Sequence, residues 1–300
     1  MKKAYKLTPA VKDIIWGGRR LIDMGKVTSS DRIAESWELS FTKGGVATAD
    51  GIPLTELFPR ETWGTACRDF PDFPVLTKFI DAGDKLSVQV HPSDEYALKN
   101  EGEFGKTEMW YVVSAEEGAG LYMGLRRECS TDEFATAVAT GRVEELLSFT
   151  PVLEGDVFFI PAGTIHAIGA GVMIYEIQQN STLTYRLYDY MRRDKNGNLR
   201  ELHVERAMKV SELKPYEKKG VSDDGEIIGS CEYFETRELS VTDELTLNVE
   251  EDSYLLISVM SGSGKIENET ASRGDSFFMP AKTGKIKLTG DMKIITVKTP

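Results

Sequence analysis

A short polar segment that ends in a histidine is the first place in this sequence where chemistry could occur. Side chains alternate along it, and the polar side carries Lys85, Ser87, Gln89 and His91. A period of two is typical of a β-strand with one polar and one apolar face. One interpretation is a metal-binding strand inside a barrel. The alternative is an edge strand whose polar face contacts water.

A second histidine ends a related segment. The chain has three histidines, at positions 91, 166 and 203. Five residues separate Gly83 from Gln89-Val90-His91, and five separate Gly155 from Pro161, which opens the pattern Pro161-x-Gly163-x-x-His166. A single such histidine is more often a core residue than a ligand. Two histidines at the ends of matched segments favour metal binding.

Together the two segments resemble the two motifs of the cupin superfamily, G-x5-H-x-H-x3–4-E and G-x5-P-x-G-x2-H-x3-N. Three positions depart from that pattern: Gln89 replaces the first histidine, Glu108 follows an insert, and Ala170 replaces the asparagine. The resulting candidate ligands are Gln89, His91, Glu108 and His166. A set of nitrogen and oxygen ligands with one carboxylate suits Zn²⁺ with an open coordination position. Fe and Mn remain open as alternatives.

Longer runs sharpen the resemblance. Residues 78–82, 86–92, 105–111 and 161–167 are similar to type I mannose-6-phosphate isomerase in its short prokaryotic form, and so are 15–18, 35–40 and 185–190. These motifs extend from about residue 15 to 190, and the six-residue run Ser-Val-Gln-Val-His-Pro is specific. The larger helical domain of the long eukaryotic forms has no counterpart here. The resemblance implies interconversion of mannose 6-phosphate and fructose 6-phosphate.

The resemblance also implies roles for individual residues. It implies one Zn²⁺ per chain, held by Gln89, His91, Glu108 and His166. It implies that Arg186 lies in the active site, and that Ser87 and Lys106 lie near the substrate.

Moving a carbonyl group from C1 to C2 requires removal of a carbon-bound proton through an enediol. The always-charged guanidinium of Arg186 could stabilise negative charge on the substrate oxygens, although it could also simply pair with an acid. Glu176 is the preferred general base because its strand face, shared with Ile174 and Gln178, could point into the barrel. A structural salt bridge is the alternative role for Glu176.

A sugar phosphate also needs cationic or hydroxyl donors. Ser87, Lys106 and Arg192 are the candidates, and each cation has a simpler interpretation. Lys106 could be a solvated loop lysine, and Arg192 lies in a run of charged residues typical of an exposed segment. His203 falls in a helical pattern and is expected to be a surface or structural residue.

Two other functions stay open. The chain could be a metal-containing cupin that isomerises a different sugar phosphate, or a non-catalytic sugar-binding cupin. The pairing of Arg186 with Glu176 favours an enzyme, because a binding protein has no need to move a proton.

Composition limits the partners. The 300-residue chain has 36 basic and 48 acidic residues, a formal net charge of −12, which disfavours nucleic acid and anionic membranes. We expect a small sugar phosphate as the partner, and the sequence does not give the oligomeric state. Three widely spaced cysteines form no disulfide framework, which favours the cytoplasm. No apolar signal segment follows Met1, and no stretch approaches the roughly 20 apolar residues needed to cross a bilayer.

These side chains must be positioned mainly by strands. The sequence predicts strands at 75–80, 172–179 and 182–190, and helices at about 93–102, 130–149 and 202–213. Ser93 and Ser130 are the predicted N-caps of the first two helices, because acidic residues follow each of them.

One segment recurs. Residues 155–166 and 274–285 share Gly, Asp, two Phe, Pro, Ala and Thr at matching positions, and Lys285 replaces His166. Such self-similarity indicates one supersecondary unit used twice. The sequence therefore predicts a mainly β protein with a double-stranded β-helix (cupin or jelly-roll) barrel and helical insertions. We expect a catalytic domain at 1–215 and a smaller cupin-like domain at 216–300 without a metal site. The first residues of the second range, up to about Gly225, are expected to form a linker.

Overall fold

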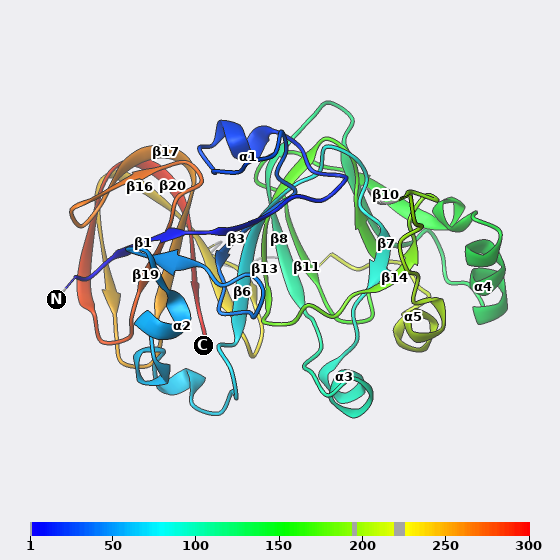
Figure 1. The fold of residues 1–300 in the computed structure, drawn as a ribbon, viewed down its shortest axis with the longest axis horizontal. Helices are drawn as coiled ribbons and strands as arrows, with labels where there is room; N and C mark the ends of the chain where they lie inside the picture. Colours follow the sequence, from blue (N-terminus) through cyan, green and yellow to red (C-terminus); the bar gives the residue numbers. More distant parts are fainter. Residues whose placement is uncertain (1, 194–196, 219–225) are drawn as a thin grey trace.

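The computed structural model describes residues 2–193, 197–218 and 226–300. Three β-sheets form the framework of the fold. Figure 1 shows the strands in the body of the molecule and short helices at its periphery. The predicted linker up to Gly225 lies partly outside the described residues. The expectation of a mainly β protein is confirmed.

The central part of the molecule consists of two antiparallel sheets. The five-stranded sheet has the order β10 (Leu147–Pro151), β9 (Gly120–Leu125), β12 (His166–Ile168), β7 (Val88–Val90) and β14 (Tyr185–Tyr188). The six-stranded sheet has the order β11 (Val157–Ile160), β8 (Glu108–Ala115), β13 (Val172–Gln179), β6 (Val75–Asp81), β3 (Glu35–Leu39) and β2 (Ala10–Lys12). Both orders are open paths, so the sheets form a jelly roll and do not close into one hydrogen-bonded barrel.

An apolar core joins these two sheets. Trp110 and Val112 of β8 share a buried cluster with Leu121 and Met123 of β9 and Ile168 of β12. Packed side chains therefore fill one part of the space between the sheets and hold them at a fixed separation.

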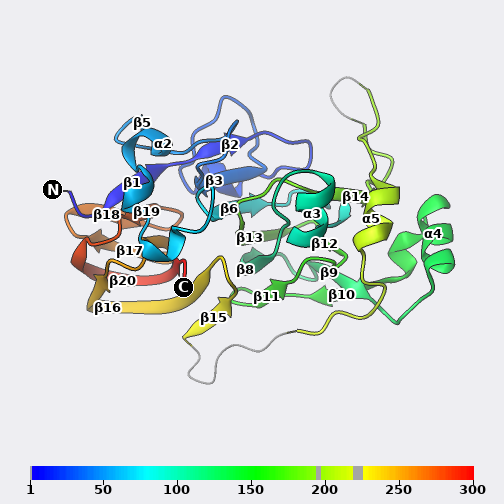
Figure 2. The same ribbon diagram turned by 90° about the horizontal axis from the view of Figure 1, so that it is seen from below.

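The third sheet comes mostly from the C-terminal part of the chain. Its order is β15 (Ile227–Ser230), β16 (Glu235–Val249), β20 (Gly284–Lys298), β17 (Leu255–Ile266), β19 (Ser276–Met279), β1 (Tyr5–Thr8), β4 (Thr48–Ala49) and β5 (Ile52–Pro53), and β18 (Glu269–Ser272) pairs with β17. Three of these strands, β1, β4 and β5, come from the N-terminal region. Figure 2 shows β1 beside β19, with which it pairs. The proposed division of the chain at residue 215 stays a prediction.

The third sheet packs firmly on the six-stranded sheet. Phe79 and Tyr175 share a buried cluster with Leu256 and Phe278. The hydroxyl groups of Tyr175 and Ser258 lie 2.7 Å apart within this contact. The C-terminal unit therefore supports the back of the sheet whose other face looks toward β7 and β12.

The repeated segment has the same local structure in both copies. Gly155 and Gly274 adopt φ values of 90° and 87°, in the left-handed region that favours glycine. Asp156 accepts a hydrogen bond from the backbone N–H of Leu153, and Asp275 accepts one from that of Ser272, three residues earlier in each case. A strand follows in each copy, so the repeat is one supersecondary unit used twice.

The helices are short. They are α1 (Arg20–Asp23), α2 (Leu54–Leu57), α3 (Asp94–Asn100), α4 (Thr131–Ala139) and α5 (Val204–Val210), with 3₁₀ turns η1 (Arg60–Thr62), η2 (Thr65–Cys67) and η3 (Val143–Glu145). No helix among the described residues is both long and apolar enough to span a membrane.

Ser93 and Ser130 are confirmed as N-caps, because their hydroxyl groups accept hydrogen bonds from backbone N–H groups of α3 and α4. The helical insert predicted to reach residue 149 is wrong at its C-terminal end. Helix α4 ends at Ala139, and residues 147–149 lie in strand β10 because they pair with β9. The helix predicted at 202–213 is confirmed only in its central part, as α5.

Candidate metal centre and active-site pocket

The polar residues of β7 and its two neighbours lie at one level of the five-stranded sheet. Gln89 of β7 is in register with His166 of β12 on one side and with Arg186 of β14 on the other. Glu108 opens strand β8 in the six-stranded sheet, and His91 follows β7 directly. Residues distant in the sequence therefore converge from both sheets.

Two histidines and one carboxylate form a compact, buried cluster. The ligand atoms of His91, Glu108 and His166 all lie within 4.8 Å of one another. His166 Nε2 lies 3.3 Å from one carboxylate oxygen of Glu108, and His91 Nε2 lies 3.6 Å from the other. Three such atoms at this spacing fit around one divalent cation.

The second ring nitrogen of each histidine is held by a backbone carbonyl. Nδ1 of His91 lies 2.8 Å from the carbonyl oxygen of Leu183, and Nδ1 of His166 lies 2.9 Å from that of Thr164. A carbonyl only accepts, so Nδ1 carries the proton and Nε2 keeps its lone pair. Burial lowers the pKa of His91 well below its usual value and lowers that of His166 to about 4. Both imidazoles are therefore neutral at pH 7, as a metal ligand must be.

Glu108 is fully buried and incompletely satisfied. Among the described residues no hydrogen-bond donor reaches its Oε1, and Lys106 Nζ lies 2.6 Å from Oε2 without the alignment of a hydrogen bond. Burial raises the pKa of Glu108 to about 7, although Lys106 opposes that rise. A bound cation would hold this carboxylate ionised, so the donor set fits a metal.

Gln89 reaches the same place from β7. Its side-chain amide lies 3.3 Å from His166 Nε2. Rotation of the amide by about 180° exchanges its nitrogen and oxygen with little change in packing. The amide oxygen can therefore face the position bounded by His91, Glu108 and His166.

Backbone contacts bring the two histidine segments together. The N–H of Gly163 donates to the carbonyl of His91 at 2.8 Å, and the carbonyl of Gly163 accepts from Glu212 N–H at 2.8 Å. The turn that precedes His166 is thereby fixed directly to the segment that carries His91.

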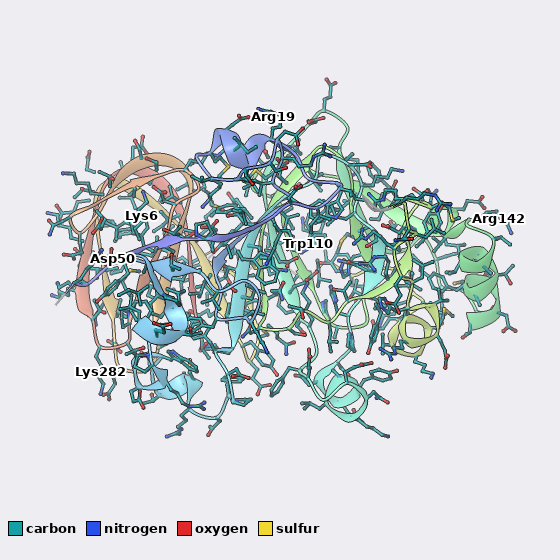
Figure 3. All side chains as sticks on the ribbon, viewed as in Figure 1. Lys6, Arg19, Asp50, Trp110, Arg142 and Lys282 are labelled. Atoms are coloured by element: carbon teal, nitrogen blue, oxygen red, sulfur yellow. The ribbon has the colours of Figure 1, made fainter. Side chains whose placement is uncertain are left out.

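A pocket of about 330 Å³ opens beside this cluster. Its polar lining consists of Glu35, Lys78, Ser87, Gln89, Lys106, Glu176, Thr182, Thr184, Arg186 and Arg200. Trp16, Ile14, Ile80, Leu86 and Ile168 supply the apolar part. Figure 3 places Trp110 of β8 in the interior near this region, where its indole lies edge-on to His166.

Charges of alternating sign extend from the cluster along the six-stranded sheet. Lys106 Nζ lies 2.6 Å from Glu108 and 3.5 Å from Glu176. Lys78 Nζ lies 3.2 Å from Glu176 and 3.7 Å from Glu35. Each buried cation thus lies between two carboxylates, which offsets much of the cost of burying these charges. The expectation that Lys106 could be a solvated loop residue is wrong, because its side chain is buried.

Glu176 faces the pocket as the sequence predicted, but it is strongly paired. Its Oε2 accepts a hydrogen bond from Trp110 Nε1 at 3.0 Å. Burial by itself would raise the pKa of Glu176, but Lys106 and Lys78 outweigh it and lower the pKa to about 2. Such a carboxylate is ionised at pH 7 and is a weak base in the free protein. Its predicted role as general base stays a prediction.

A loop contact also fixes Lys106. Asp94 Oδ1 accepts from the backbone N–H of Gly105 at 2.7 Å and from the side-chain amide of Gln179 at 3.0 Å. The hydroxyl of Tyr233, which belongs to the C-terminal part, donates to the other carboxylate oxygen. The segment before Lys106 is therefore held through Asp94 by both parts of the chain.

Arg186 points along the pocket toward Ser87. Its Nε lies 3.2 Å from Ser87 Oγ, and its Nη1 donates to the carbonyl of Glu201 at 2.8 Å. Nδ1 of His203 accepts from the backbone N–H of Arg186 at 3.2 Å. His203 therefore has a structural role, as the sequence indicated.

Arg192 and Arg200 differ in position. Arg192 pairs with Asp189 and donates to the carbonyl of Lys85, and it is not among the pocket-lining residues. Its contact with a phosphate group stays a prediction. Arg200 lines the pocket but was not singled out from the sequence.

Lys78 and Glu35 also line the pocket but were not singled out from the sequence. A lysine inside the apolar run 75–80 was a usable signal for Lys78, because buried lysines almost always have a charged partner. Glu35 and Arg200 had no such signal, since neither lies inside a long apolar run.

Comparisons with known proteins agree with this geometry. The family model described as "Mannose-6-phosphate isomerase, cupin domain" matches residues 226–299. The chain is 38% identical over 301 residues to the mannose-6-phosphate isomerase of Streptococcus mutans, covering 94% of this chain and 93% of that relative. It is 36% identical over 299 residues to mannose-6-phosphate isomerase ManA of Bacillus subtilis, with 94% of each chain covered. The crystal structure of the Bacillus subtilis mannose 6-phosphate isomerase matches with a TM-score of 0.89 at 34% identity, covering 99% of each chain.

Proposed function

The chain belongs to the mannose-6-phosphate isomerase family, and on this premise we propose that it interconverts mannose 6-phosphate and fructose 6-phosphate. One observation carries the proposal. A cluster of two neutral histidines and one carboxylate lies beside a pocket, and the polar lining of this pocket includes two lysines and two arginines. An aldose–ketose isomerase needs both parts, because negative charge develops on the substrate oxygens during proton transfer.

We propose that His91, Glu108 and His166, together with Gln89, hold one Zn²⁺ per chain. Their nitrogen and carboxylate donors support this choice over a metal that requires oxygen ligands alone, and Fe and Mn remain alternatives. When bound, the metal supplies Lewis-acid polarisation of the substrate oxygens. Glu108 supports the proposal most directly, since its buried carboxylate has no hydrogen-bond donor for Oε1 among the described residues.

Other pocket residues are proposed to bind the substrate, stabilise its charge and accept the proton. Lys106 is buried, and its carboxylate neighbours raise its pKa against the effect of burial, so it stays protonated and can donate to a substrate oxygen. Arg186 supplies a fixed positive charge beside Ser87. We keep Glu176 as the candidate proton acceptor, because it lines the pocket and lies outside the proposed ligand set. Ser87 and Lys106 line the pocket and are the proposed substrate-binding residues; the sequence also predicted Arg192, which is not among the pocket-lining residues.

A coupled assay with mannose 6-phosphate tests this function. Turnover should be present, should stop on treatment with a chelator, and should return on addition of Zn²⁺, Fe²⁺ or Mn²⁺ in an order that identifies the metal. Elemental analysis should find about one metal ion per chain. Turnover of another hexose phosphate in preference would indicate a related isomerase. Sugar binding without turnover would indicate the non-catalytic cupin.

Cys67 and Cys129 are free thiols in the structure. Free thiols persist in a reducing compartment, so we propose the cytoplasm as the location of the protein.

A further inference from the structure

The pocket has two guanidinium groups, one from each of two neighbouring segments. Arg186 comes from β14, and Arg200 comes from the segment between β14 and α5. Both line the pocket together with the hydroxyl-bearing residues Ser87, Thr182 and Thr184. This wall therefore carries hydrogen-bond donors of the kinds that bind oxyanions.

The arginines of this wall have fewer carboxylate partners than the two lysines of the pocket. Lys78 and Lys106 each lie between two carboxylates. Within the described residues, by contrast, no carboxylate oxygen lies within ion-pair distance of Arg186. Arg200 pairs, in the part of the chain that the structure describes, only with Asp189, at 3.2 Å. The arginine wall thus has an excess of positive charge that a dianionic group would neutralise.

Asp189 holds one nitrogen of the Arg200 guanidinium, and the other guanidinium nitrogens are available as hydrogen-bond donors. Its Nη1 contacts both carboxylate oxygens of Asp189, at 3.2 and 3.4 Å. In the described part of the chain, its Nε and Nη2 make no hydrogen bond. Unused guanidinium donors beside a pocket are suited to phosphate, which guanidinium binds in a two-pronged geometry.

Asp189 is a buried carboxylate that holds Arg200 in place. Its carboxylate is 4% exposed and also pairs with Arg192, which donates to the carbonyl of Lys85 in the segment that leads to β7. The next two residues, Tyr190 and Met191, adopt φ values of 55° and 56°, a left-handed conformation that costs free energy outside glycine. The backbone is therefore strained directly after Asp189, the residue that lies between the two arginines.

We propose that Arg200, positioned by Asp189, binds the phosphate group of the substrate together with Arg186 and Ser87. The inference rests on the proposed sugar-phosphate isomerase function and assigns its phosphate specificity. In this arrangement Arg192 acts on the phosphate only indirectly, by fixing Asp189. Ser87 lies two residues before Gln89, roughly 7 Å away along an extended chain. That spacing is comparable to the distance between the carbonyl end and the phosphate of an open-chain hexose 6-phosphate.

Mannitol 6-phosphate is the probe that separates binding from turnover, since it has no carbonyl group to isomerise. Calorimetric titration should show that Arg200→Gln weakens its binding roughly 10- to 100-fold, the value of a charged hydrogen-bond pair. Arg200→Lys should recover part of that loss. Arg193→Gln is the matched control, because Arg193 is exposed in the same segment and contacts the carbonyl of Gly197 outside the pocket. It should bind like the unmodified protein.

Kinetics give the second measurement. With mannose 6-phosphate, Arg200→Gln should raise KM by a similar factor and change kcat only a few-fold, because a distant phosphate contact is nearly the same in ground and transition states. Unchanged binding and KM in Arg200→Gln would overturn the inference while leaving the isomerase function in place. Arg200-dependent binding of mannitol 6-phosphate without any turnover of mannose 6-phosphate would uphold the phosphate site and reject the isomerase function.

Discussion

Replacing Lys106 with methionine should destabilise the metal-free protein and at the same time strengthen metal binding. The ammonium group lies 2.6 Å from Glu108, and both side chains are at most 5% exposed. Removing one partner of a buried ion pair costs about 3–5 kcal/mol, because the other charge is left uncompensated. In the metal-loaded protein a cation still faces Glu108, so the cost there should be smaller than in the metal-free protein.

Thermodynamic linkage turns this difference into an affinity. If the variant loses about 1.4 kcal/mol less stability with metal than without it, its metal affinity must rise about tenfold. Urea unfolding with chelator and with saturating Zn²⁺ measures the two stabilities, and a competition titration measures the affinity independently. Turnover should fall in the same variant, because Lys106 faces the pocket.

Lys209→Met is the matched control. Lys209 pairs with Glu205 at 2.8 Å on the exposed surface of α5, and neither residue belongs to the cluster or to the pocket lining. Its loss should affect metal-free and metal-loaded protein equally. An equal stability loss in both states of Lys106→Met, or weaker metal binding by that variant, would refute the assignment of Glu108 as a ligand beside a competing cation.

Other substitutions separate metal binding from catalysis. His166→Ala should remove both bound metal by elemental analysis and turnover, while the circular dichroism of the folded chain persists. Arg186→Ala should keep the metal but lower kcat, and normal turnover would remove Arg186 from the mechanism. Glu176→Gln should lower kcat about 10²- to 10⁴-fold if Glu176 is the base, whereas near-normal turnover would leave it a purely structural ion-pair role. Tyr233→Phe should lower kcat several-fold with unchanged metal content, because Asp94 loses a hydrogen-bond donor and holds the segment before Lys106 less firmly. An unchanged kcat would show that this contact does not position Lys106.

The sequence by itself determined most of the local structure. Strict alternation indicated which face of the segment ending at His91 is polar, and the strand predicted at 172–179 is found with those bounds. Ser93 and Ser130 marked the starts of α3 and α4, because N-cap chemistry is local. The repeat of residues 155–166 also predicted a second copy of one turn and strand. Patterns of this kind depend on neighbours in the chain and can be recognised without knowledge of the fold.

Only the tertiary structure decided which of these faces meet. Period-two alternation places Lys78 on a strand, but it does not reveal that Glu35 and Glu176 lie on either side of its ammonium group. Nor does it reveal that Arg200 lines the pocket while Arg192 lies outside it. Pairing across sheets depends on register and on packing between segments distant in sequence, which local propensity does not encode. The charged pairs of this pocket therefore follow only from the tertiary structure, in which β6, β8 and β13 lie side by side.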